Sequence, residues 1–256
     1  MPEDPPSHLR AQTIAGVIDS LDRIVAWSKE HASRLGYFAA LYRRVTVHVA
    51  RDIEHGRFED GPRMERLDVI FANRYLDAVE RHCAREETTR AWGVAFVALR
   101  RWPPIVLQHL MLGMSAHINL DLGIAAAETC GAADLPALRH DFFAINFILA
   151  ALVDTVQRKL ADVWPLMRLI DLAAGRGDEL VASVGMVAAR ERAWSLAEAL
   201  AALPREAWPA EIDRRDHAVA ALGHRLLSPR PLMRSALWLV RLGELRSVAR
   251  VIERLE

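Results

Sequence analysis

Cysteine is nearly absent from this 256-residue sequence, which contains only Cys83 and Cys130. Two cysteines are too few for a disulfide framework, and neither belongs to a Cys-x-x-Cys pair, so zinc fingers and dithiol redox motifs are excluded. An excess of charge of either sign is also missing, because 33 basic side chains balance 33 acidic ones. Without a global basic field, we expect no nucleic-acid partner.

Long apolar runs and secretion signals are missing as well. The longest clean apolar run, residues 142–153, is interrupted by Asn146 and is too short to span a bilayer, so no transmembrane segment is predicted. Residues 1–8 are polar and rich in proline, and they lack the basic and apolar regions of a signal peptide. We therefore expect a disordered N-terminus over residues 1–8 and a cytoplasmic protein.

Helical periodicity dominates the rest of the chain. Hydrophobic residues make up 52% and charged residues 26%, which is the composition of a globular domain. No segment alternates with period two for long enough to predict a strand, whereas helical spacing predicts helices at 9–30, 34–56, 62–84, 87–101, 104–129, 135–173 (kinked or divided at Pro165), 178–203, 206–227 and 231–255. The expected fold is all-α: residues 9–256 form a single compact domain of about eight or nine helices around a buried central helix, 104–129.

The predicted central helix carries two polar stripes although it has no charged face, which is typical of a helix buried on all sides. At 100° per residue, one face collects His109, Gly113, His117 and Asp121. The opposite face collects Gln108, Ser115 and Asn119. Gly113 leaves room for a close approach by a backbone, a side chain or a ligand. Buried polar groups are costly without partners, so we take these stripes as the candidate centre.

His117 and Asp121 lie one helical turn apart, and their pairing permits three interpretations. The carboxylate can fix the tautomer of the imidazole and raise its basicity, as in a general acid/base pair. With His109 two turns earlier, the residues His109, His117 and Asp121 could instead hold a metal ion. The third interpretation is a structural polar network that ties helices together. No cofactor is predicted, and the metal stays an open alternative.

Arg74 is a charged residue in the apolar stripe of the predicted helix 62–84. A guanidinium keeps its charge when it is buried, so it needs an anionic partner. We expect Asp121 first and a bound carboxylate or phosphate second. Asp77, one turn further on, is the local alternative.

Asp141 and Asn146 lie among aromatic and aliphatic residues of the predicted helix 135–173, and both are candidates for positioning a ligand. The adjacent pair His140-Asp141 also resembles the doublet of helical metal phosphohydrolases. Those enzymes need an earlier histidine and a later aspartate as well. The sequence offers His82 or His109, and Asp154, for these roles.

Three phrases of the sequence resemble an uncharacterised, mainly bacterial family known as domain of unknown function 5995. They are MERLDVIFANRYL at 64–76, LQHLMLGMSAHINLDLG at 107–123 and DFFAIN at 141–146. The resemblance runs over most of the chain, from Tyr37 to Trp194. Ser115 stands where the family commonly has asparagine, which exchanges an amide for a hydroxyl on the second stripe. The resemblance implies an all-α domain and brings no activity, substrate or cofactor.

Taken together, these residues predict a small-molecule enzyme that acts on a mostly apolar substrate in an interhelical pocket. His117 would be the general acid/base, Asp121 its orienting carboxylate and Arg74 the anchor for an anionic group. The other ligand-binding candidates are His109, Asn119, Asp141 and Asn146. One alternative is a non-catalytic helical binding or scaffold protein with a structural polar core, and the other is a metal-dependent hydrolase. A homo-oligomer is compatible with all three.

Overall fold

The computed structural model describes residues 5–146, 148, 178–228, 235, 237, 238, 240, 241, 244 and 247–256, without the side chains of 178–184. All regular structure in these residues is helical, so the predicted fold class is confirmed. Pro165, with its predicted kink, lies outside the described residues.

Four helices open the fold: α1 (Ile14–Glu30), α2 (Leu35–Glu54), α3 (Gly61–Ala84) and the shorter α4 (Arg90–Leu99). The central rod follows as α5 (Val106–Ala116), a π-helical turn η1 (His117–Asp121) and α6 (Leu122–Thr129). Residues 135–146 are helical as well. The later described elements are α9 (Asp178–Ala201), the 3₁₀ turn η2 (Arg205–Ala207), α10 (Trp208–Leu227) and α12 (Val248–Leu255).

The first and last predicted helices differ from the structure because side-chain caps start α1 and α12 later. The Thr13 side chain accepts a hydrogen bond from the Gly16 amide at 3.1 Å, so α1 begins at Ile14 and not at residue 9. The predicted helix 231–255 is not continuous, since residue 244 lies in a bend and Ser247 caps α12. Before α1, the carbonyls of Ser7 and His8 accept hydrogen bonds from Arg23.

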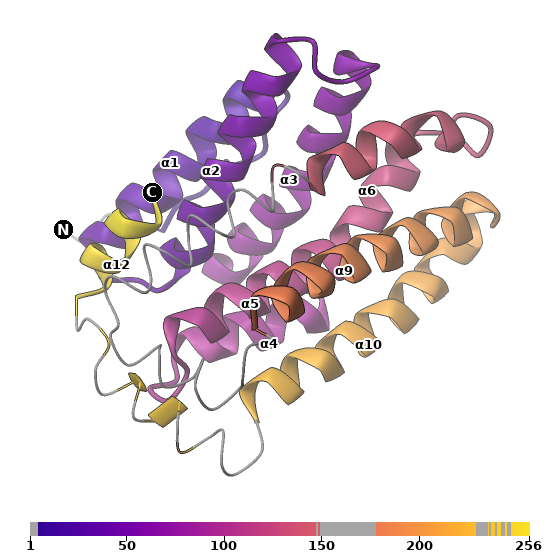
Figure 1. The fold of residues 1–256 in the computed structure, drawn as a ribbon. Coiled ribbons are helices and arrows are strands. Elements are labelled where there is room, and N and C mark those ends of the chain that lie inside the picture. Colours follow the sequence, from indigo (N-terminus) through magenta and orange to yellow (C-terminus); the bar gives the residue numbers. More distant parts are fainter. Residues whose placement is uncertain are drawn as a thin grey trace.

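The central rod runs through the middle of the fold (Figure 1). α2 contacts α5, and α3 contacts η1 and α6, while α4, α9 and α10 pack around the remaining surface of the rod. The rod, Val106–Thr129, is long and apolar enough to cross a membrane, yet 89% of its most apolar window is buried inside the protein. It is therefore the core helix that its uncharged faces predicted.

Two glycines let neighbouring helices approach this rod closely. A Cβ atom on Gly113 would lie 2.6 Å from Cγ of Phe38 on α2, and one on Gly123 would lie 2.5 Å from the Ala193 carbonyl oxygen on α9. Both distances are far below van der Waals contact, so only glycine fits. The close approach expected at Gly113 is that of a side chain, the ring of Phe38.

Gly113→Ala should lower the free energy of unfolding by about 1–3 kcal/mol, because the Phe38 ring and its Cβ have to move. Gly93→Ala is the matched control, since Gly93 lies inside α4 and a Cβ there meets only Thr88 Oγ1, at 3.7 Å. The control should gain about 0.5–1 kcal/mol from helix propensity. Urea unfolding measures both, and equal effects of the two substitutions would contradict the close packing at Gly113.

Candidate functional site

A π-helical turn interrupts the central rod at the residues of the candidate centre. The Leu122 amide donates to the carbonyl of His117, five residues earlier, instead of to a carbonyl four residues earlier. Single π-helical turns inside α-helices occur frequently at functional sites. Although such a turn winds by less than 100° per residue, Asp121 still lies beside His117 and Arg74, as the sequence predicted.

Asp121 collects three donors from three different parts of the fold. Arg74 Nε donates to Oδ1 at 3.1 Å, and Trp92 Nε1 donates to Oδ2 at 2.9 Å. His117 Nδ1 lies 3.4 Å from the same Oδ2. Asp121 is 1% exposed, so its charge is compensated inside the core and not by solvent. We call Asp121, Arg74, Trp92 and His117 the Asp121 cluster.

Arg74 thus meets the partner that was expected first, and the local alternative is engaged elsewhere. Asp77 pairs with Arg10 at 3.2 Å, on the surface. A second carboxylate, Glu128, lies 3.9 Å from Arg74 Nη1. With two acidic neighbours, Arg74 is held as a structural cation, which leaves it poorly placed to anchor an anionic ligand.

His117 is enclosed by aromatic rings. Phe71 stacks on the imidazole with centroids 3.6 Å apart, and Tyr42 meets it edge-on at 4.5 Å. Burial lowers the pKa of His117, and the hydrogen bond with Asp121 opposes that shift, so the ring is neutral at pH 7. Its Nε2 atom is buried and has no hydrogen-bond partner among the described residues. His117 therefore has the orientation of an acid/base histidine but no open path to a substrate.

The same region buries three more polar atoms that lack partners among the described residues: Tyr42 Oη, Asp68 Oδ2 and Tyr75 Oη. Burial, with a smaller contribution from Glu65, raises the pKa of Asp68 to about 7. Burial and the nearby Asp68 charge raise the pKa of Tyr42. Asp68 was not predicted from the sequence, although it follows Leu67 and precedes Phe71 by one turn on the apolar stripe that identified Arg74.

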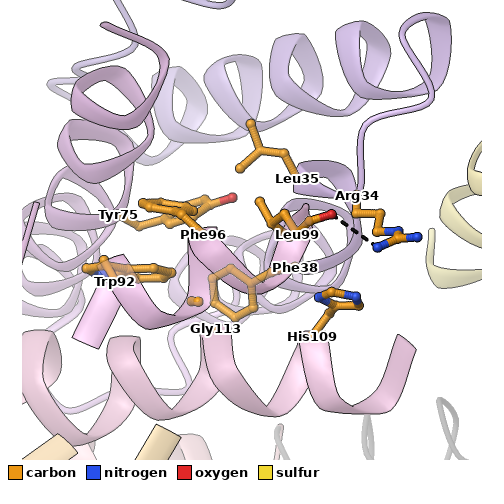
Figure 2. Close-up of a pocket in the computed structure, with 10 residues that line it drawn as sticks. Arg34, Leu35, Phe38, Tyr75, Trp92, Phe96, Leu99, His109 and Gly113 are labelled. Atoms are coloured by element: carbon orange, nitrogen blue, oxygen red, sulfur yellow. Dashed lines mark hydrogen bonds between the residues drawn. The ribbon is translucent and has the colours of Figure 1, made fainter. Parts of the chain in front are cut away.

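His109 lies beside a separate small cavity between α2, α3, α4 and α5 (Figure 2). The cavity has a volume of about 20 Å³, enough for about one water molecule. Its lining is mostly aromatic and apolar: Arg34, Leu35, Phe38, Tyr75, Trp92, Ala95, Phe96, Leu99, His109 and Gly113. We call it the His109 cavity.

His109 itself is neutral and poorly bonded. Burial, with the charges of Arg34 and Arg241, lowers its pKa to about 3, and the Pro104 backbone only partly opposes this shift. Neither ring nitrogen makes a hydrogen bond of normal geometry with the described residues. The neutral imidazole carries one N–H donor and one acceptor nitrogen, and with the Pro104 backbone near one of them the other is left without a partner.

Three aromatic residues connect the His109 cavity to the Asp121 cluster. Phe38, Tyr75 and Trp92 line the cavity, and their ring centroids lie 5.7, 6.0 and 6.1 Å from that of His117. Phe38 rests on Gly113, which lies one turn from each histidine along the rod. The two histidines thus share a face of the rod but lie in different surroundings.

The second polar stripe faces α9 and α10 and is engaged in helix packing. Gln108 Nε2 donates to the carbonyl of Leu226 on α10 at 2.7 Å. Asn119 accepts a hydrogen bond from Arg192 on α9 at 3.3 Å and donates to Ser115 at 3.4 Å. Asn119 does not line the His109 cavity, and its described contacts are those of a residue that ties two helices together.

Asp141 and Asn146 belong to a third region. Asp141 accepts hydrogen bonds from the amides of Glu59 and Asp60, at 2.8 and 2.9 Å, and so holds the chain that enters α3. Asn146 Oδ1 is buried without a partner among the described residues. Neither residue joins the Asp121 cluster or lines the His109 cavity.

The structure does not assemble the two metal sites considered from the sequence. Among the described residues, the group of possible ligands close enough for one ion is Glu59, His140 and Asp141, and not His109, His117 and Asp121. For a phosphohydrolase site, His82 lies toward the opposite end of α3 from Asp60, roughly 33 Å along the helix axis. His109 is not in that group either, and Asp154 lies outside the described residues.

Comparison with known proteins assigns the chain to a family but does not indicate an activity. The chain matches the model of a family described as a family of unknown function (DUF5995) over residues 14–229. No curated protein and no solved structure matches it. Any function therefore has to be argued from the site.

Asp121→Asn should lower the free energy of unfolding by about 2–3 kcal/mol. Arg74 loses its charged acceptor, and the NH2 group that replaces one carboxylate oxygen faces another N–H donor. Trp92→Phe removes only the indole N–H and should cost about 1 kcal/mol. Chemical denaturation at pH 7 measures both values. An Asp121→Asn cost no larger than that of Trp92→Phe would show that the carboxylate charge is not needed in the core.

Asp68→Asn should stabilise the protein at pH 8 and leave it nearly unchanged at pH 4. Because folding raises the pKa of Asp68 from 3.8 to about 7, the wild type loses stability as the pH rises between these values. At about 1.4 kcal/mol for each pKa unit, the gain at pH 8 is at most about 4 kcal/mol. Asp19→Asn, at an exposed position on α1, is the control. Parallel stability–pH curves for wild type and Asp68→Asn would contradict the burial of an ionisable Asp68.

Proposed function

We propose that this chain, which belongs to the family of unknown function DUF5995, binds a small, mostly apolar molecule carrying a hydroxyl group in the His109 cavity. One observation carries the proposal: unpartnered polar atoms of His109 and Tyr75 occur where aromatic rings line a cavity. Buried polar atoms without partners are rare in proteins and call for a water, an ion or a ligand. Apolar walls with few convergent polar groups are typical of small-molecule sites.

The polar groups of the cavity specify the chemistry of the ligand. His109 is neutral at pH 7, so it favours a neutral hydroxyl over a carboxylate. With Pro104 near one ring nitrogen, the other is free to accept a hydrogen bond from the ligand. Arg34 donates to the carbonyls of Leu99 and Arg101 at the edge of the cavity, which reduces its capacity to bind an anion.

Entry of a ligand requires the cavity to widen, because about 20 Å³ is far below the roughly 300 Å³ of an ordinary small-molecule site. Phe38 is the residue whose displacement would widen it most directly, since its ring fills the space over Gly113 and separates the cavity from His117. The Asp121 cluster would then act as the fixed support, because it holds the indole of Trp92, which forms one wall.

Phenol and toluene are matched probes for this proposal, since they differ only by a hydroxyl in place of a methyl group. Phenol should raise the melting temperature of the wild type more than toluene does. His109→Leu should abolish that difference, because the hydroxyl loses its acceptor. His82→Leu is the matched control: His82 stacks on Phe96, a lining residue, at 4.4 Å but does not line the cavity itself.

Phe38→Ala tests whether the cavity can open at all. This variant should bind both probes more tightly than the wild type, because truncation of the ring enlarges the cavity. If neither probe raises the melting temperature of the wild type or of Phe38→Ala, the cavity is a packing defect. The scaffold interpretation of the polar core is then the better one.

A second candidate, catalysis by His117, is favoured by the free Nε2 atom of an imidazole whose Nδ1 faces a carboxylate. This arrangement is that of an oriented general base. It requires Phe38 to move, so that a ligand in the cavity reaches His117. His117→Gln measured in the same probe experiment separates the two: an unchanged phenol response places the ligand at His109 alone.

A further inference from the structure

A group of metal-ligating side chains lies away from both the His109 cavity and the Asp121 cluster. It joins Glu59, in the connection between α2 and α3, to His140 and Asp141 in the helical residues 135–146. His140 Nδ1 lies 3.2 Å from Glu59 Oε1 and 3.7 Å from Asp141 Oδ1. One ligand atom from each residue lies within 4.8 Å of the others.

The two distances from His140 fit the edges of a coordination polyhedron around one small cation. Zinc binds imidazole nitrogen and carboxylate oxygen at about 2.0–2.2 Å, so two tetrahedral ligands lie about 3.3–3.6 Å apart. The two measured separations lie close to either side of this range. One imidazole with two carboxylates is also a ligand set that borderline divalent metals accept.

We propose that Glu59, His140 and Asp141 form a Zn²⁺ site with three protein ligands and at least one position open to water. Glu59 and His140 have side chains that are 61% and 72% exposed, so the open position would face solvent. Three protein ligands with a free position are the pattern of zinc sites that activate water, whereas structural zinc sites are closed by four. The site does not depend on ligand binding at His109.

Asp141 is the rigidly held ligand of the proposed site. Its side chain is 1% exposed, and the amides of Glu59 and Asp60 hold its two oxygens in place. Arg63 Nη2 donates to the Ala137 carbonyl at 3.0 Å and lies 3.8 Å from Asp141 Oδ2, where its charge compensates that of the carboxylate. The hydrogen bonds orient Oδ1 toward His140, as outer-sphere hydrogen bonds do for metal-ligating carboxylates. Only Glu59 and His140 then have to adjust when the ion binds.

The described residues also contain an exposed histidine–carboxylate pair that serves as a comparison for the proposed site. His217 Nδ1 lies 3.4 Å from Asp213 Oδ2 on α10, and both side chains are more than half exposed. The pair has a similar distance and exposure, but it is not part of a group of three possible ligands. It therefore separates a metal site from an ordinary histidine–carboxylate contact.

Isothermal titration of the full, tag-free protein with Zn²⁺ tests the proposal. The wild type should bind one ion, and His140→Ala and Glu59→Gln should each weaken that binding by at least about tenfold. Both residues are exposed, so neither change should disturb folding, which circular dichroism checks. Asp141→Asn is unsuitable as the sole test because Asp141 also holds the entry to α3. His217→Ala should bind Zn²⁺ like the wild type.

Co²⁺ supplies a second readout that reports coordination directly. Bound to the wild type, it should show the visible absorption of a four- or five-coordinate ion, and this spectrum should disappear in His140→Ala. The proposal fails if the wild type binds no Zn²⁺, or if His140→Ala and Glu59→Gln both bind it like the wild type. It also fails if His217→Ala loses as much affinity as they do. None of these outcomes depends on the phenol experiment.

Discussion

The Asp121 carboxylate is the interaction on which the core of this protein depends. A buried charge is tolerated only when it is paired and fully hydrogen-bonded, and Asp121 reaches this state by drawing donors from α3, α4 and the rod itself. Because the three donors come from different helices, their positions are fixed relative to one another. The orientation of Trp92, and with it one wall of the His109 cavity, follows from this one carboxylate.

Around that satisfied centre lies a second set of polar atoms that are not satisfied. Tyr42, Asp68, Tyr75, His109 and His117 each bury a polar atom without a partner among the described residues. Such atoms reduce stability, which is why they are usually retained only where a water, an ion or a ligand completes them. His117 belongs to both sets, because its Nδ1 faces Asp121 while its Nε2 has no partner, whereas His109 and Tyr75 line the cavity on which the proposed function rests.

The sequence predicted the fold class and most helix positions, because helical spacing of apolar residues is a local property that survives in the structure. It also predicted a partner for Arg74, since a buried guanidinium needs an anion wherever it is placed. It did not predict the burial of Asp68, because a single acidic residue beside Leu67 on an amphipathic helix is assigned to the solvent-exposed face until the packing is known. It did not identify Trp92 as a partner of Asp121, because an indole N–H donates one hydrogen bond to any acceptor within reach.

The sequence by itself determined that one uncharged helix would be buried and that His109, Gly113, His117 and Asp121 would lie along it. Only the tertiary structure decided that His109 would line a cavity while His117 and Asp121 would join the Asp121 cluster. Phe38 of α2 fills the space at Gly113, whereas Arg74 of α3 and Trp92 of α4 bind Asp121. Periodicity fixes which residues of a helix share a face. The residues that each of them contacts across that face belong to helices far away in the sequence, and these contacts cannot be derived from local spacing.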